Sequence, residues 1–130
     1  MISFTELEVL ESILSIQSKA LGHDEIHLKF IKLILSFGLP IIRHVFNHII
    51  ANNIFPSAWK IAKIIPVAKK STASEPSDYR LISILSSLSK AFEKLLSKQI
   101  LKHINDNNLL SSCQSGFQQG KSCNTAIISL

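Results

Sequence analysis

The first fifty residues alternate hydrophobic and polar positions with the period of an α-helix. Thr5 and Glu8 have the spacing of a capping box, in which a threonine hydroxyl caps a helix and a glutamate reaches back to the cap. They predict a short amphipathic helix over residues 5–18, which Gly22 ends. The apolar positions at helical spacing in this segment are Leu7, Leu10, Ile13 and Leu14.

Two more helices are expected before the chain reaches its middle. Asp24 is the expected cap of the first, and the run Gly38-Leu39-Pro40 interrupts it. Pro40 suits the first turn of the next helix, where a missing N–H does no harm. The expected apolar faces are Ile26, Phe30, Leu33, Ile34 and Phe37 in the first helix, and Ile42, Val45, Phe46, Ile49 and Ile50 in the second.

Two segments rich in isoleucine and other strand-forming residues predict a small antiparallel β-hairpin. The first strand covers residues 61–67, with Pro66 near its end or on an edge because proline cannot donate to a sheet. Residues 69–77 form a polar turn, and residues 79–84 form the returning strand.

A long helix starting at Ser87 or Ser89 follows, and the run of residues 105–108 stops it. Its expected inward positions are Leu88, Phe92, Leu95, Leu96, Ile100 and Ile104. The predicted fold class is therefore α+β and mostly helical, with N-terminal helices, a small antiparallel β-hairpin and a long helix.

The composition predicts an ordered protein in a reducing compartment. Hydrophobic residues make up 46% of the 130 positions, which argues against disorder. The most apolar window, residues 30–50, contains Lys32 and Arg43 and is not expected to span a membrane. No secretory signal is visible, and Cys113 and Cys123 suggest neither a metal site nor a disulfide framework. We expect an intracellular location, in cytoplasm or nucleus, without membrane contact.

Positive charge is concentrated in the second part of the chain. Residues 1–55 carry four Lys/Arg and five Asp/Glu, a net charge of −1, whereas residues 56–130 carry ten and four, a net charge of +6. The long helix contributes a stripe of lysines at every fourth position: Lys90, Lys94, Lys98 and Lys102. This distribution suits a phosphate-rich partner, although a solvated helix face produces the same stripe.

Lys69, Lys70 and Arg80 flank the predicted hairpin turn. A hairpin brings the ends of its arms together, so these cations can converge on one phosphate group. Arginine offers a fork of donors, while each lysine acts as a mobile point charge. Basic turns also serve solubility alone, and the sequence leaves both interpretations open.

Other site chemistry finds little support. Residues 116–122 place three residues between the glycines where a nucleotide-hydrolysing phosphate loop needs four. Lys121 at a helix start can still meet an anion. His44 and His48 are one helical turn apart without the glutamate of a metalloprotease between them, so we expect core or surface histidines.

Four blocks, in order, resemble the N-terminal part of the reverse transcriptase domain of non-LTR (LINE-type) retrotransposons. One block would be a weak signal, but four in order over most of residues 19–130 are specific. The first block, residues 19–26, is similar to Lys-Ala-Pro-Gly-Pro-Asp-Gly-Ile, and the second comprises Phe55-Pro56 with Trp59-Lys60 and then Ile65-Pro66-Val67 with Lys69-Lys70. The third, residues 79–85, is similar to Tyr-Arg-Pro-Ile-Ser-Leu-Leu and is followed by Phe92-Glu93-Lys94. The fourth, residues 114–123, is similar to Gln-x-Gly-Phe-Arg-x-Gly-x-Ser-Thr.

The resemblance implies that residues 1–130 are part of a reverse transcriptase domain, namely the fingers and the entry to the palm. Lys69 or Lys70 and Arg80 would contact the triphosphate of the incoming deoxynucleotide. The template-side residues carried over by position are Lys19, Gly116, Phe117, Gly120 and Lys121. The implied partners are an RNA template or DNA, a deoxynucleotide triphosphate and the palm domain.

In this family the carboxylates for catalytic metal ions lie downstream of the fourth block, and the sequence ends at Leu130 before reaching them. We therefore expect no catalytic residue, no metal site and no cofactor in this chain, with Mg²⁺ used by the full-length polymerase. The chain alone is expected to lack polymerase activity. The alternative function is a non-catalytic, basic helical module that binds nucleic acid or another partner.

The blocks also depart from the family pattern at several positions. Glu25 stands where the family has a glycine, at a position expected to need a backbone angle that favours glycine. Other family residues are replaced by Leu21, His23, Leu81, Gln118 and Cys123. So many departures in one chain suggest a copy in decay.

Overall fold

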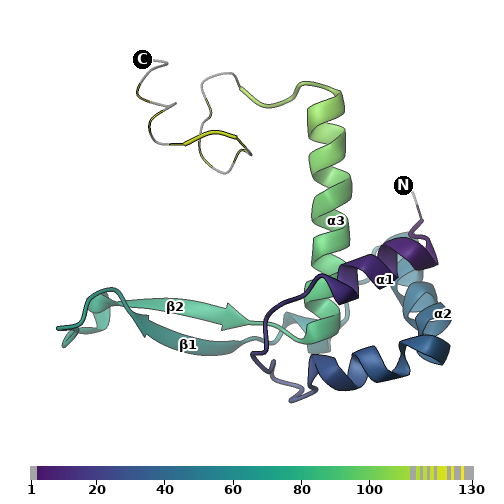
Figure 1. Cartoon of the computed structure of the whole chain (residues 1–130), viewed down its shortest axis with the longest axis horizontal. Coiled ribbons are helices and arrows are strands. Elements are labelled where there is room, and N and C mark those ends of the chain that lie inside the picture. The colour runs from purple at the N-terminus through teal and green to yellow at the C-terminus, as the bar shows by residue number, and fades with distance from the viewer. Residues whose placement is uncertain are drawn as a thin grey trace. The chain divides into compact units, whose positions relative to one another are not determined.

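The structure is a computed structural model that describes residues 3–111, 114, 116, 118, 120–122, 124 and 127. Within this described part, three α-helices and one two-stranded antiparallel sheet confirm the predicted α+β, mostly helical fold (Figure 1). The elements are α1 (Glu6–Leu14), α2 (Leu28–Asn52), η1 (Ser57–Lys60), β1 (Lys63–Ala68), η2 (Pro76–Asp78), β2 (Tyr79–Ile84) and α3 (Ser87–Asp106). The chain divides into two compact units, Met1–Leu96 and Ser97–Leu130.

Aromatic rings gather around Phe92 in the core of the first unit. Phe92 is 1% exposed. Its ring centroid lies 5.2 Å from that of Phe46, 5.8 Å from that of Trp59, 6.0 Å from that of Phe55 and 6.1 Å from that of Phe4. Aromatic pairs at such separations stabilise a fold beyond the area that they bury. This cluster joins α2 and α3 to the segments that precede α1 and β1.

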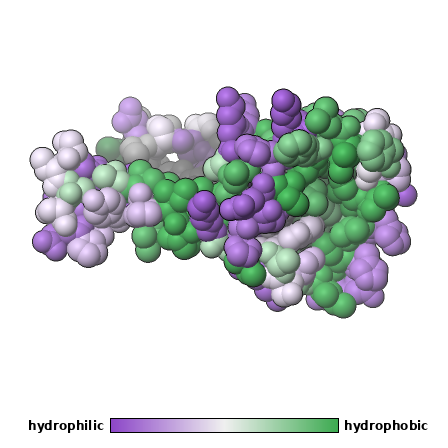
Figure 2. Space-filling model, turned by 90° about the horizontal axis from the view of Figure 1, so that it is seen from below, coloured by the Kyte–Doolittle hydropathy of each residue, from purple (hydrophilic) through white to green (hydrophobic). Residues whose placement is uncertain are grey.

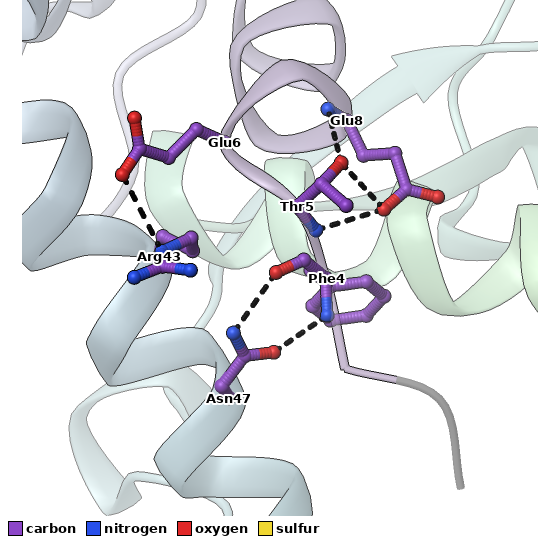
Figure 3. A network of polar contacts seen from close by, with 6 residues as sticks. All are labelled: Phe4, Thr5, Glu6, Glu8, Arg43 and Asn47. Carbon is purple, nitrogen blue, oxygen red and sulfur yellow. Dashed lines mark hydrogen bonds and ion pairs between the residues drawn. The ribbon is translucent and has the colours of Figure 1, made fainter.

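Polar contacts fasten the start of α1 to the second half of α2 (Figure 3). The Phe4 N–H donates to Asn47 Oδ1 at 2.7 Å, and Asn47 Nδ2 donates back to the Phe4 carbonyl at 3.0 Å. Glu6 and Arg43 form an exposed ion pair at 3.6 Å nearby. The reciprocal asparagine contact satisfies both backbone groups of Phe4 where the chain enters the core.

The predicted capping box starts α1. Thr5 Oγ1 accepts a hydrogen bond from the Glu8 N–H at 3.3 Å, and Glu8 Oε2 accepts one from the Thr5 N–H at 2.9 Å. The helix ends at Leu14, earlier than the predicted residue 18. Ser15 explains this end, because its hydroxyl donates to the Ser12 carbonyl at 2.7 Å and closes the last turn.

The buried face of α1 differs from the predicted one. Ile13 is buried as predicted, but the other buried residues are Val9 and Ser12, whereas Leu7 and Leu14 are 64% and 52% exposed. The Ser12 hydroxyl donates to the Ala91 carbonyl of α3 at 2.7 Å. A small side chain that also satisfies a carbonyl allows close helix packing, which a count of apolar positions does not reveal.

One continuous helix, α2, replaces the two helices predicted on either side of Pro40. Proline has no N–H, so the carbonyl of Ser36 loses its helical partner. Ser36 is exposed, and water can therefore hydrogen-bond this carbonyl. Figure 1 shows the ribbon of α2 changing direction near its middle, as expected for a proline inside a helix.

Because α2 is continuous, one face runs through its whole length. The buried residues along it are Ile31, Leu35, Gly38, Ile42, Phe46 and Ile49. In the second half of the helix the prediction was right for Ile42, Phe46 and Ile49, whereas Val45 is 40% exposed. In the first half the predicted face was wrong, because the predicted residues lie outward. Those outward residues, 43–70% exposed, are Ile26, Phe30, Leu33, Ile34 and Phe37.

β1 and β2 pair as predicted, in a register that runs from Lys63 opposite Ile84 to Ala68 opposite Tyr79. The first strand is displaced slightly toward the turn relative to the predicted residues 61–67. Figure 2 shows hydrophobic surface along the hairpin. Its exposed apolar residues are Ile64, Ile65, Val67, Leu81 and Ile82.

The long helix begins at Ser87 and ends at Asp106, as predicted. Phe92 and Leu95 are buried in the core, also as predicted. Ile100 was expected to point inward but is 56% exposed. The core contacts of α3 lie in its first half, which belongs to the first unit, so apolar spacing alone overestimates the buried length of the helix.

A tight turn precedes α2. The Glu25 N–H donates to the Gly22 carbonyl at 3.3 Å, and Asp24 Oδ1 accepts from the Ile26 N–H at 3.3 Å. Asp24 thus stabilises the turn and does not cap α2, contrary to the prediction. The N-cap of α2 is His27, which makes no capping hydrogen bond through its side chain.

Gly22 lies against the backbone at the junction of β2 and α3. A Cβ atom at this position would lie 2.7 Å from Ser86 N and 2.8 Å from Leu85 O. We expect Gly22→Ala to lower the free energy of unfolding by about 1–3 kcal/mol in urea denaturation, since backbone must move. Gly38→Ala is the control, because its Cβ would meet only the Ile34 side chain at 3.6 Å. Equal losses in both variants would contradict the close approach.

Glu25 has a φ angle of 54°, so the expected need for a glycine-like backbone is confirmed. A side chain in this left-handed region destabilises the fold. We expect Glu25→Gly to raise the free energy of unfolding by about 0.5–1 kcal/mol, since relief of strain exceeds the added chain entropy. Glu25→Ala keeps the strain and should bring no such gain. Urea denaturation measures both, and a larger gain from alanine would contradict the strain.

Candidate nucleic-acid interface

Asp78 organises the turn between β1 and β2. Its carbonyl accepts from the Lys69 N–H at 2.8 Å, which extends the strand pairing into the turn. Lys70 Nζ lies 2.8 Å from Asp78 Oδ1 in an ion pair. Lys69 Nζ donates to the Ser77 carbonyl at 2.6 Å. Two of the three predicted phosphate-binding cations are thus held within the turn itself.

The second carboxylate oxygen of Asp78 binds backbone amides. Asp78 Oδ2 accepts from the N–H groups of Ser74 at 3.1 Å and Glu75 at 3.3 Å. The Lys70 ammonium foremost, and then these two amides, hold the pKa of the Asp78 carboxyl below its ordinary value of 3.8. The turn is therefore arranged around an ionised carboxylate.

Arg80 differs from the two lysines. It is exposed, and no hydrogen bond or ion pair reaches its side chain from the described part of the chain. It lies opposite Val67 in the strand pairing, so both side chains project from the same face of the hairpin. Arg80 therefore offers its guanidinium donors to an external anion without giving up an internal contact.

The template-side residues of the fourth block belong to the second unit. Lys121 Nζ donates to the Gln114 carbonyl at 3.1 Å, and the Lys121 N–H donates to the Gln118 carbonyl at 3.3 Å. Gly120 has a φ angle of 79°, which favours glycine there. Gly116 has open space around it. Phe117, the remaining predicted residue of this block, lies outside the described residues.

The lysine stripe on α3 is partly used inside the protein. Lys90 Nζ donates to the Ala20 carbonyl at 3.2 Å and so ties the first block to the helix. Lys98 also has an interaction partner. Lys94 and Lys102 have none among the described residues. Lys19 lines a surface hollow together with Lys29, which sequence reasoning did not single out because the hollow depends on the tertiary arrangement.

His44 and His48 are exposed and stack with centroids 6.3 Å apart. Both are surface histidines, one of the two environments expected. Over the residues that the structure describes, no group of three His, Cys, Asp or Glu side chains could hold a metal ion.

Three of the four blocks that carry the sequence resemblance meet in the first unit. Phe55 and Trp59 of the second block contact Phe92, which follows the third. Gly22 of the first block packs on Ser86, directly after the third. Their spacing along the sequence therefore corresponds to one packed arrangement.

No protein-family model matches the chain. Curated relatives from Drosophila melanogaster do match it. A probable RNA-directed DNA polymerase from transposon BS is 32% identical over 88% of this chain, and one from transposon X-element is 34% identical over 90%. The RNA-directed DNA polymerase from mobile element jockey is 33% identical over 77%. The chain spans 11–13% of the length of these relatives.

These matches, together with the packed blocks, show that the chain is similar to one segment of the curated RNA-directed DNA polymerases. Within this class it belongs to the reverse transcriptases of non-LTR retrotransposons, as its four blocks indicated.

The Asp78 contacts predict an acid-sensitive turn. Because the pKa of this carboxyl is lower in the folded chain than its ordinary 3.8, its stabilisation is present above that value and is lost as pH falls through the folded pKa. We expect Lys70→Met to raise the Asp78 pKa toward 3.8 in an NMR titration of the carboxyl carbon. Lys63→Met, at the other end of the hairpin, is the control. An unchanged pKa in Lys70→Met would show that the amides alone lower it.

Proposed function

We propose that the chain supplies the finger region of an RNA-directed DNA polymerase and that its hairpin binds phosphate groups of the template and of the incoming deoxynucleotide. The observation that carries this proposal is the unpaired, exposed guanidinium of Arg80 beside a turn whose two lysines are held in place. The match to three polymerase relatives supports it.

In this proposal Arg80, Lys70 and Lys69 have different roles in phosphate binding. Arg80 meets a phosphate first, because a planar guanidinium can donate two parallel hydrogen bonds to it. Lys70 follows by exchanging Asp78 for the phosphate. The Lys70 side chain is 57% exposed, and an ion pair so exposed contributes only about 0–1 kcal/mol, so the exchange costs little. Lys69 keeps the turn closed through Ser77.

Polymerase chemistry in the complete enzyme requires carboxylates that hold two metal ions. In this proposal the present chain positions substrate, while the palm domain supplies the carboxylates and uses Mg²⁺. We also propose an intracellular location without membrane contact. By length and composition α2 could cross a membrane, but in the first unit it contributes buried residues, including Phe46, to the core.

The alternative is a stand-alone basic module that binds nucleic acid through the α3 stripe. Lys94 and Lys102 favour it, because neither has a partner in the described part of the chain. The two functions predict different sensitive residues: Arg80 in the first and Lys94 in the second.

We expect Arg80→Gln to weaken binding of a single-stranded RNA oligonucleotide and to reduce the slope of log affinity against log salt by about 0.7, the value for one phosphate contact on a single strand. Fluorescence anisotropy over a salt series measures both quantities. Lys94→Gln removes one exposed charge from α3 and is the matched control, expected to change affinity little.

A larger loss in Lys94→Gln than in Arg80→Gln would favour the stand-alone module over the finger region. If the unmodified chain showed no salt-dependent RNA binding, phosphate recognition by either surface would be contradicted.

A further inference from the structure

A hollow of about 540 Å³ opens in the first unit between the segment that follows α1 and the first turns of α2. Its volume lies within the range of small-molecule pockets, roughly 300–1,000 Å³, and is ample for a nucleotide. The residues that line it include Ile16, Lys19, Leu28, Lys29, Lys32 and Ser87. No carboxylate is among its described lining residues, so the local charge is positive.

Ser87, the first residue of α3, is 4% exposed and lines this hollow. Its hydroxyl has no hydrogen-bond partner in the described part of the chain. Every fully buried side-chain oxygen or nitrogen in the described part of the chain has a hydrogen-bond partner. The Ser87 hydroxyl, which has none, must therefore belong to the small part of Ser87 that remains exposed. That surface borders the hollow. A nearly buried hydroxyl is thus left to hydrogen-bond whatever enters.

The start of α3, whose first residue Ser87 lines the hollow, also carries backbone donors. Ser86 caps the helix, since its hydroxyl accepts from the Ser89 N–H at 3.2 Å and its carbonyl accepts from the Lys90 N–H at 3.0 Å. The N–H groups of Ser87 and Leu88 precede these and have no acceptor among the described residues. Unpaired amides at the positive end of a helix attract anions.

Three lysines give the hollow its positive charge. Lys19 and Lys29 have no partner among the described residues, and Lys32 Nζ donates to the Leu14 carbonyl at 3.3 Å. Between the lysines, the wall formed by Ile16 and Leu28 is apolar. A ligand with an anionic end and a flat, less polar body matches this division.

We propose that the hollow binds one nucleotide unit of a single-stranded nucleic acid, with its phosphate at the start of α3 and its sugar and base along the apolar wall. Ser87 and the amides of Ser87 and Leu88 would donate to the phosphate, and Lys19 and Lys29 would neutralise it. This site rests on the proposed function, because it gives the strand a second anchor in addition to Arg80.

The hollow is built before a ligand arrives. Gly22 packs on Ser86, and Lys90 Nζ donates to the Ala20 carbonyl at 3.2 Å, so the segment that carries Lys19 is fixed against the start of α3. A fixed site loses less conformational entropy on binding than a mobile one.

The test uses the whole chain and a single-stranded RNA oligonucleotide, with adenosine monophosphate and inorganic phosphate as separate probes. We expect the double variant Lys19→Gln/Lys29→Gln to weaken RNA binding roughly tenfold or more, as expected when charge-assisted hydrogen bonds are lost. The double variant Lys94→Gln/Lys102→Gln removes the same charge from α3 and should keep most of the affinity. Ser87→Asp should abolish binding at the hollow by repulsion.

NMR of the unmodified chain provides a readout that needs no variant. RNA and adenosine monophosphate should shift the Ser87 and Leu88 amide signals, with inorganic phosphate much weaker. Equal affinity for inorganic phosphate would overturn a nucleotide site in favour of adventitious anion binding. RNA binding that depends on Arg80 but leaves these amide signals unshifted would overturn the proposed nucleotide site in the hollow and leave the proposed function standing. Absence of RNA binding would overturn both.

Discussion

The contact of the Phe92 ring with four other aromatic rings holds the first unit together. Phe4 brings the entry to α1, Phe46 brings α2, and Phe55 and Trp59 bring the segment that leads into the hairpin. Removing such a ring leaves a cavity at the point where all of these elements meet, and large-to-small changes of this kind typically cost about 3–5 kcal/mol. Both proposed phosphate sites depend on this cluster, because it fixes α3 relative to α2 and the hairpin base.

Much of the fold could be predicted because its signals are local. The capping box of Thr5, the strand pairing across the turn and the limits of α3 each depend on residues close together in the sequence. The inner face of α2 could not be predicted in its first half, because Pro40 reads as a break when only its own chemistry is considered. The second half of α2, which contains Phe46, packs into the core. This tertiary packing keeps the helix continuous and outweighs the local preference of Pro40 for a helix start.

In the candidate site too, local features could be predicted from the sequence and long-range contacts could not. Sequence reasoning found Lys69, Lys70 and Arg80 together, since a hairpin must bring them close, but it could not show that Asp78 already binds Lys70. Ser87 and Lys19 lie far apart in the sequence, and the tertiary contacts of Gly22 and Ala20 with the start of α3 make them neighbours of one hollow. The strained backbone at Glu25 agrees with a chain that has drifted from its family, although this history stays a hypothesis.

Several contacts of the first unit join residues far apart in the sequence, and this separation determines when the structure can form. Ser12 bonds a residue 79 positions later, and Ala20 accepts from a lysine 70 positions later. Loop closure over such distances must precede the stabilisation that it brings, which slows folding. During synthesis, α1 and the inner apolar face of α2, which includes Phe46, therefore remain without their partner until Phe92 has left the ribosome. For that interval the nascent chain is a natural client for chaperones that shield hydrophobic segments.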